Sequence, residues 1–354
     1  MFTKIKKKLT SLFRYPLAGI KGNLFFLLYN PFFRLTRLFS KKQIPSNEPF
    51  SKILLCCRAS FGDVLIACSL IPAIKERYPE ALIGFLCNPE TKDIFLAQRG
   101  IDFIHTAGGE ELRKVEYDLS IELHPFFPNS IPLVWKAKIP QRIGFASGGY
   151  DLLLTDPVPF PQKSDYLPYL YGELVKKVGI VEFTPSLQVE VVPYLYNKEY
   201  LVLHLGTSDP RKEWDLSKWK ELSIRLNQEG FFLFFTGKGE REKKLVQEAF
   251  GESLGKNVCD QLTWSEFASL ILGAKAVISV DSLAVHLAAL QKVPVVALYF
   301  YSHGVELWTP KEGPVSLLIG KKAIRRNEEI VHPKAIYLDE INVLDILHSL
   351  KSLI

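Results

Sequence analysis

The sequence predicts an α/β fold made of two similar domains, each with a parallel, doubly wound sheet. Short apolar strands alternate with helices from residue 52 to residue 123. The alternation restarts at residue 200, after a stretch at 184–199 that is rich in Pro and Tyr. Such alternation is typical of a parallel sheet covered by helices. The chain has 354 residues, which is enough for two domains of ordinary size.

The first domain is expected to span residues 48–190. Its first strand, 52–57, is apolar, and a helix at 64–78 follows and ends before Pro79. The other elements expected in this domain are strands at 82–86, 103–104 and 117–123 and a helix at 92–98.

The second domain is expected to span residues 191–335. It repeats the same pattern, with strands at 200–205, 231–235, 276–280 and 293–298 and helices at 217–229, 241–250 and 264–272. A further helix begins at Ser282, directly after the strand at 276–280, in the run that ends at Leu290. A last helix at about 340–353, within the remaining residues 336–354, could pack back onto the first domain.

Residues 1–47 form a basic amphipathic segment. They contain ten Lys and Arg and no acid, so the other residues carry −4 of the chain's formal net charge of +6. A general nucleic-acid-binding surface is therefore disfavoured, and no nucleic-acid partner is expected. Apolar residues fall on one helical face between the lysines, namely Phe2, Ile5, Leu9, Leu12 and Phe13.

No uninterrupted apolar run in this segment approaches the roughly 20 residues that span a bilayer. The favoured interpretation is a segment that lies on the anionic inner membrane leaflet. The alternative is a helical arm packed on its own protein or on a partner chain. A secretory signal is less favoured, because no convincing small-x-small cleavage site follows.

The five cysteines show no C-x-x-C spacing of a metal or redox site. We expect them to be reduced core thiols of a cytosolic protein, with a catalytic cysteine as the minor alternative. They are Cys56, Cys57, Cys68, Cys87 and Cys259.

Candidate functional residues follow the strand at 276–280. Asp281 and Ser282 lie between this strand and the next helix, and His286 shares a helix face with Ser282 at the i, i+4 spacing. Ligands of open α/β sheets bind at the carboxyl ends of the strands, where the helix N-terminus also offers backbone N–H groups. The simpler interpretation is that Asp281 or Ser282 only caps the helix.

A second candidate loop, Ser60–Asp63, follows the first strand of the chain. Gly62 allows close approach of a ligand, and Asp63 opens a helix whose dipole favours a negative charge. Asp63 is therefore a candidate general base, with a plain helix cap as the equal alternative. His124 follows the strand at 117–123 and could equally be an ordinary strand-end histidine.

Two further loops follow strands of the second domain. The loop 206–214 offers hydroxyls and two cations that suit phosphate oxygens, although it lacks the Walker spacing. The loop 236–242 contains Gly237 and Gly239, which allow close approach of a ligand, and then Glu240, which could bind ribose or sugar hydroxyls. A solvated loop is the alternative for the loop 206–214.

Read in order, these loops resemble glycosyltransferase family 9, the heptosyltransferases of lipopolysaccharide core assembly. The resemblance covers roughly residues 50–350 and includes Leu70–Lys75 and Gln141–Phe145. It implies a GT-B fold, with two Rossmann-like domains that face each other across a cleft. It also implies inverting, metal-independent transfer of heptose from ADP-heptose, with no cofactor, to a lipid-linked saccharide acceptor at the cytoplasmic face of the inner membrane.

The resemblance also implies roles for individual residues. Asp63 would be the base, with Ser60, Gly62 and His124 on the acceptor side. The donor diphosphate would be bound by Thr207, Ser208, Lys212, Ser282 and His286. The donor nucleoside and sugar would be bound by Gly237, Glu240, Asp281 and Leu283.

The chain departs from the family pattern in two places. Leu283 stands where the family often has glycine. The loop with Gly237 is one residue shorter, so Glu240 could exchange roles with Glu242. Alternatives to heptose transfer are a GT-B transferase for another nucleotide sugar or lipid-linked acceptor, and a catalytically silent scaffold of envelope assembly.

Overall fold

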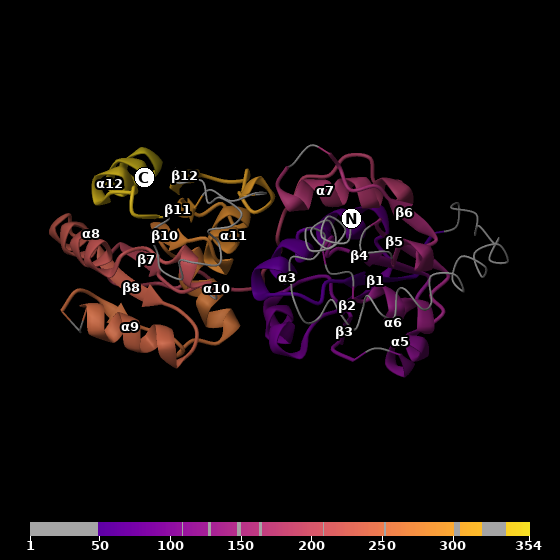
Figure 1. Cartoon of the computed structure of the whole chain (residues 1–354). Helices are drawn as coiled ribbons and strands as arrows, with labels where there is room; N and C mark the ends of the chain where they lie inside the picture. The colour runs from indigo at the N-terminus through magenta and orange to yellow at the C-terminus, as the bar shows by residue number, and fades with distance from the viewer. Residues whose placement is uncertain are drawn as a thin grey trace, which may run out of the picture.

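The computed structural model describes residues 49–107, 109–126, 129–146, 150–162, 165–207, 209–250, 253–300, 305–320 and 338–354. The basic segment predicted at 1–47 lies outside these residues, as does Ser208. The described chain folds into two lobes that lie side by side (Figure 1). None of the helices in the described ranges has the length and apolar content of a membrane span.

The first lobe contains a parallel six-stranded sheet in the order β3-β2-β1-β4-β5-β6. Its strands are β1 (Lys52–Cys56), β2 (Leu82–Leu86), β3 (Phe103–His105), β4 (Leu119–Glu122), β5 (Gln141–Phe145) and β6 (Asp156–Val158). Its helices are α3 (Phe61–Cys68), α4 (Ile71–Arg77), α5 (Glu110–Val115), α6 (Ile131–Lys136) and α7 (Leu167–Val175), with short 3-10 helices η1 (Pro89–Ala97), η2 (Tyr150–Leu153) and η3 (Lys176–Val178).

The second lobe repeats this plan, with strand order β12-β11-β10-β7-β8-β9. Its strands are β7 (Tyr200–His204), β8 (Phe232–Thr236), β9 (Lys256–Asn257), β10 (Ala276–Val280), β11 (Val295–Phe300) and β12 (Val315–Gly320). Its helices are α8 (Leu216–Gln228), α9 (Glu240–Phe250), α10 (Trp264–Leu272), α11 (Leu283–Leu290) and α12 (Val343–Leu353), with 3-10 helices η4 (Pro210–Lys212) and η5 (Val305–Leu307).

Both sheets therefore have the Rossmann strand order, which confirms the predicted fold class. Each order reverses at one point, between β1 and β4 in the first sheet and between β7 and β10 in the second. Ligands of such sheets bind outside the carboxyl ends of the strands at this switch point. The fold thus selects four loops, those that follow β1, β4, β7 and β10.

The single helix predicted at 64–78 is two helices in the structure. α3 ends at Cys68, and α4 begins at Ile71 with Pro72 in its first turn. Proline has no N–H to donate within a helix, and its ring clashes with the preceding turn, so Pro72 starts a new helix instead of continuing the first. The predicted helix at 92–98 is the 3-10 helix η1.

The last helix packs on the second domain, not on the first as the sequence suggested it could. α12 contacts α8, β11 and β12 (Figure 1). Its buried face includes Ile346, Leu347 and Leu350, which join the core around Trp214 and Trp219. Trp214 also donates from Nε1 to the carbonyl of Ile341, just before this helix, at 3.1 Å.

The two domains share one hydrophobic core. α11 is buried on every side from Ala284 to Leu290, which is the pattern of an internal helix. It packs against β10 and β11 of its own sheet and against α3 of the other domain. The largest core cluster consequently runs from Ile53 in β1 to Val295 in β11. This apolar contact places the loops after β1 and β10 next to each other.

Candidate active site

Asp63 lies at the start of α3, in the first turn of the helix. Ser60 donates to its Oδ2 twice, from the backbone N–H at 3.1 Å and from the hydroxyl at 2.6 Å. Among the described residues, no other hydrogen bond to this carboxylate is present. Oδ1 is therefore the oxygen that could accept a proton from a substrate hydroxyl.

The loop after β4 lies near Asp63. His124 is buried, and its pKa is lowered by burial, while the nearby carboxylate of Asp63 acts in the opposite direction. The backbone N–H of His124 donates to Oε1 of Glu122 at 3.0 Å. Burial raises the pKa of Glu122 to about 8, so this carboxyl holds its proton at neutral pH. Glu122 was not among the predicted site residues.

In the second domain, Lys212 and Asp281 form an ion pair. Nζ of Lys212 lies 2.6 Å from Oδ2 of Asp281, and the Asp281 side chain is only 12% exposed. The two residues come from the loops after β7 and β10, which flank the switch point of the second sheet. Burial raises the pKa of Tyr299, and Asp281 raises it further through its charge and a hydrogen bond.

Ser282 is the N-cap of α11, as the simpler interpretation held. Its hydroxyl accepts from the N–H of Ala284 at 3.2 Å and shares a hydrogen bond of 2.9 Å with Ser279. Leu283 begins the helix and packs against the main core. The protein therefore accommodates leucine, a larger side chain than the glycine often found at this position in the family, through apolar contacts with its own core.

His286 lies between the two halves of the site. It is buried, and burial lowers its pKa to about 4, against the opposing effects of Asp281 and Asp63. Its Nδ1 lies 3.1 Å from the hydroxyl of Tyr166, and its Cδ2 lies 3.8 Å from where a Cβ at Gly62 would be. The helix spacing identified His286 from sequence, but nothing local marks Tyr166, 120 residues away.

The two loops after β7 and β8 meet at Glu242. Its Oε2 accepts from the N–H of Lys238 at 2.7 Å. A Cβ at Gly206 would lie 1.8 Å from this oxygen and one at Gly237 would lie 2.6 Å from it, so both glycines are needed for this approach. Burial raises the pKa of Glu242, while the N–H groups of Lys238 and Thr207 act against it.

Glu240, the predicted nucleoside ligand, lies at the exposed start of α9. Its carboxylate is 4.0 Å from both Lys243 and Lys244 of the same helix. The structure therefore places Glu242, and not Glu240, between the glycine loops. Thr207 is buried, and its hydroxyl accepts from the N–H of Asp209 at 3.2 Å.

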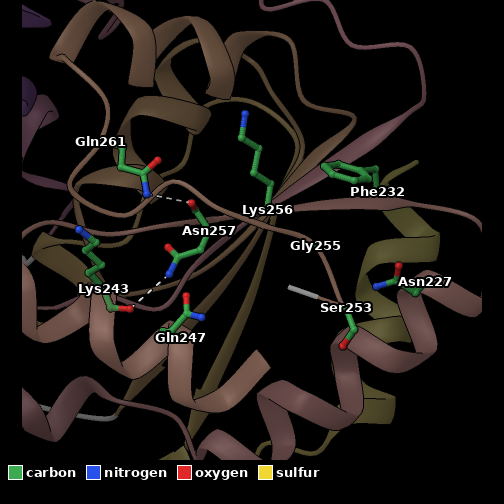
Figure 2. A pocket seen from close by; sticks show the side chains of 9 residues that line it. All are labelled: Asn227, Phe232, Lys243, Gln247, Ser253, Gly255, Lys256, Asn257 and Gln261. Atoms are coloured by element: carbon green, nitrogen blue, oxygen red, sulfur yellow. Dashed lines mark hydrogen bonds between the residues drawn. The ribbon is translucent and has the colours of Figure 1, made fainter. Parts of the chain in front are cut away.

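Two cavities lie apart from these residues. One of about 500 Å³ opens beside β9 and α9 and is lined by Lys243, Lys256 and amide side chains (Figure 2). Three of its amides, those of Asn227, Asn257 and Gln261, already donate to backbone carbonyls, as Asn257 does to that of Lys243 at 3.2 Å. The other, of about 720 Å³, lies at α5 and α6. Neither is lined by a predicted site residue.

The cysteines are all free and buried, as predicted for core thiols. Burial raises their pKa values, which disfavours the reactive thiolate. In the described part of the chain, His, Cys, Asp and Glu side chains do not gather into a group that could hold a metal ion.

Glu122 makes a pH-dependent contribution to stability. Between about pH 4.5 and 8 the folded protein keeps a proton that the unfolded chain releases, so stability falls as pH rises, by up to about 1.4 kcal/mol per unit. Glu122→Gln should therefore unfold at higher temperature than the wild type at pH 7.5, with the difference vanishing near pH 4.5. Thermal unfolding of both proteins between pH 4.5 and 8 measures this difference in unfolding temperature. Glu80→Gln, at an exposed position, is the control. A difference that does not vary with pH would contradict the assignment.

Comparisons with known proteins agree with this architecture. A family model described as glycosyltransferase family 9 (heptosyltransferase) matches residues 163–332. Lipopolysaccharide heptosyltransferase 2 of Salmonella typhimurium is 24% identical over 346 residues, covering 85% of this chain and 99% of that protein.

Two solved structures share the fold. A family 9 glycosyltransferase from Veillonella parvula has a TM-score of 0.71 at 18% identity, covering 86% of this chain and 97% of the other. The Escherichia coli ADP-heptose LPS heptosyltransferase II has a TM-score of 0.69 at 20% identity, covering 85% and 98%. The GT-B fold expected from the resemblance is confirmed. The predicted resemblance to glycosyltransferase family 9 is thus confirmed, and the chain is a glycosyltransferase.

Proposed function

We propose that this protein transfers a heptose from ADP-heptose to the core saccharide of a lipopolysaccharide acceptor, with inversion at the anomeric carbon. The observation that carries the proposal is the position of His286, which is influenced by Asp63 on one side and by Asp281 and Lys212 on the other. A candidate base and candidate donor ligands thus meet at one point. The names of the Salmonella relative and of the E. coli structure support heptose as the sugar and LPS as the acceptor.

In the proposed reaction, an acceptor hydroxyl attacks the anomeric carbon while Asp63 takes its proton. The bond from that carbon to the β-phosphate oxygen breaks, and its electron pair leaves with the diphosphate. A single displacement with one base inverts the anomeric configuration and needs no covalent intermediate.

The leaving diphosphate would be stabilised by groups of the second domain. Lys212 supplies a positive charge, Thr207 and Ser208 supply hydroxyls, and the start of α11 at Ser282 supplies backbone N–H groups. These groups can serve without a metal ion. Donor binding would exchange partners in the Lys212–Asp281 pair, with a phosphate replacing the carboxylate and sugar hydroxyls replacing the ammonium.

Asp63→Asn tests both the base and the enzyme assignment. It should lower kcat by roughly 10²–10⁴-fold while leaving ADP binding unchanged, because general base catalysis is lost but the donor site is not. ADP release from ADP-heptose in the presence of acceptor measures the rate, and Asp93→Asn, an exposed site in η1, is the matched control. Full transfer activity of Asp63→Asn would show that another group is the base, whereas no transfer by the wild type would favour a silent scaffold. Release of nucleotide only from a hexose donor would exclude heptose as the sugar.

We also propose that Glu242 takes the nucleoside-side role that the sequence assigned to Glu240. Glu242 lies at both glycine loops, whereas Glu240 is exposed. Glu242→Gln should raise the Kd for ADP by on the order of tenfold, since a hydrogen bond to a charged group is lost. Glu240→Gln should change it less than about twofold, as expected for an exposed position. Calorimetric titration of both variants with ADP measures the two Kd values. A larger increase in Kd for Glu240→Gln would restore the original assignment.

The basic segment 1–47 is proposed to hold the enzyme on the cytoplasmic face of the inner membrane, where a lipid-linked acceptor lies. Deleting these residues should weaken cosedimentation with anionic vesicles, most clearly at low salt, because exposed charges are screened as salt rises. ADP binding should be unaffected in the same variant, which checks its folding. Equal sedimentation of both proteins would instead indicate an arm that packs on protein.

A further inference from the structure

The hydroxyl of Tyr166 makes a polar contact across the two domains at the site. Tyr166 is fully buried just before α7, a helix that packs against β5 and α3 of the first domain. His286 is on α11 of the second domain. Their rings lie nearly parallel, with centroids 5.9 Å apart and an interplanar angle of 13°, and the hydroxyl lies 3.1 Å from Nδ1.

Contacts on both sides of Tyr166 hold it against the second domain. The preceding residue, Asp165, forms an ion pair with Lys311. Tyr169, one turn later, hydrogen-bonds Glu312. Since Lys311 and Glu312 lie between η5 and β12, this short segment of the first domain is anchored at three points on the second.

Hydrogen-bond accounting assigns the tautomer of His286. Burial raises the pKa of Tyr166, so its hydroxyl keeps its proton. Among the described residues, Nδ1 of His286 is the hydrogen-bond partner of this hydroxyl. If Nδ1 carried the ring proton, the buried hydroxyl would have no acceptor for its own, which is costly. The hydroxyl therefore donates to Nδ1, and the single proton of the neutral imidazole is on Nε2.

The ring edge that carries Nε2 faces the site. Cδ2, the neighbour of Nε2 in the ring, is the atom closest to the Cβ position at Gly62, directly before Asp63. Lys212 and Asp281 both act on the imidazole from the donor side. No hydrogen bond from Nε2 to a described residue is present. A proton on Nε2 is thus available to a ligand at this junction.

We propose that Tyr166 is a positioning residue of the transferase: it holds His286 in the Nε2–H tautomer, so that Nε2 donates to an oxygen of the leaving diphosphate. The diphosphate half of this inference rests on the proposed function, whereas the tautomer half does not. A neutral donor fits this place, because it adds a hydrogen bond without repelling Lys212.

The tautomer is tested first, without substrate. Nitrogen-15 NMR of histidine-labelled protein should show His286 with its proton on Nε2, assigned by the loss of this signal in His286→Gln. Tyr171→Phe is the matched control, since Tyr171 is also fully buried in α7 and its hydroxyl has no partner among the described residues. Tyr171→Phe should keep the signal, and Tyr166→Phe should give a mixture of tautomers. A wild-type signal with the proton on Nδ1 overturns the proposal.

Binding and kinetics test the diphosphate contact. Adding ADP should shift the Nε2 signal in the wild type. Tyr166→Phe should lower kcat by on the order of tenfold with the acceptor KM unchanged, because the lost hydrogen bond forms in the transition state. In the His286→Gln background, Tyr166→Phe should lower kcat no further, since the two residues act as one unit. An equal loss in that background would show a packing role and overturn the proposal.

Failure of the proposed function gives a different pattern. In that case the wild type would neither bind ADP nor release it from ADP-heptose, yet the tautomer would still change in Tyr166→Phe and persist in Tyr171→Phe. Thermal unfolding of both variants checks that each remains folded. An unfolded Tyr166→Phe protein is replaced by Tyr166→Trp, whose indole N–H can also donate to Nδ1 and should preserve the Nε2–H tautomer. Loss of that tautomer in a folded Trp variant counts against the proposal.

Discussion

The apolar packing of α11 against α3 is the constraint on which the rest of the site depends. α11 is buried from Ala284 to Leu290, and this burial joins the two sheets into one continuous core. Because both helices start at the switch points of their sheets, their contact brings together the two places where an α/β sheet binds ligands. Asp63 and His286 come into proximity by this packing, although each belongs to a different domain.

Burial then divides the polar groups of the site into charged and neutral ones. His286 and His124 have lowered pKa values and Glu122 a raised one, so all three are neutral near pH 7. The low dielectric of the interior disfavours further charge, and the remaining charges come from partly exposed side chains. The site therefore combines neutral buried groups with a few charged side chains at its surface, an arrangement that suits the binding of a diphosphate. Each interaction with that anion is less screened there than in water.

The sequence predicted the parallel sheets and the loops that matter, because both follow from local patterns. Apolar strands that alternate with helices indicate a doubly wound sheet, and polar residues directly after a strand lie at its carboxyl end. Asp63, Lys212 and Asp281 were selected as candidates in this way. The long helix predicted at 64–78 was wrong, because the apolar pattern continues through Pro72 while the backbone cannot.

Contacts between distant segments could not be predicted from these patterns. An amphipathic helix shows which face it buries and not what covers that face, so α12 could have packed on either domain. Similarly, Glu240 and Glu242 follow the same glycines, and only the position of the two loops decides which carboxylate lies between them.

The sequence by itself determined the fold class, the four loops and most of the candidate site residues in them. Only the tertiary structure decided that Tyr166 forms a hydrogen bond with His286, that Glu242 lies between the two glycine loops and that Glu122 is protonated. Periodicity and spacing describe one segment at a time. A hydrogen bond across 120 residues, or a pKa set by burial, depends on which surfaces the packed chain brings together.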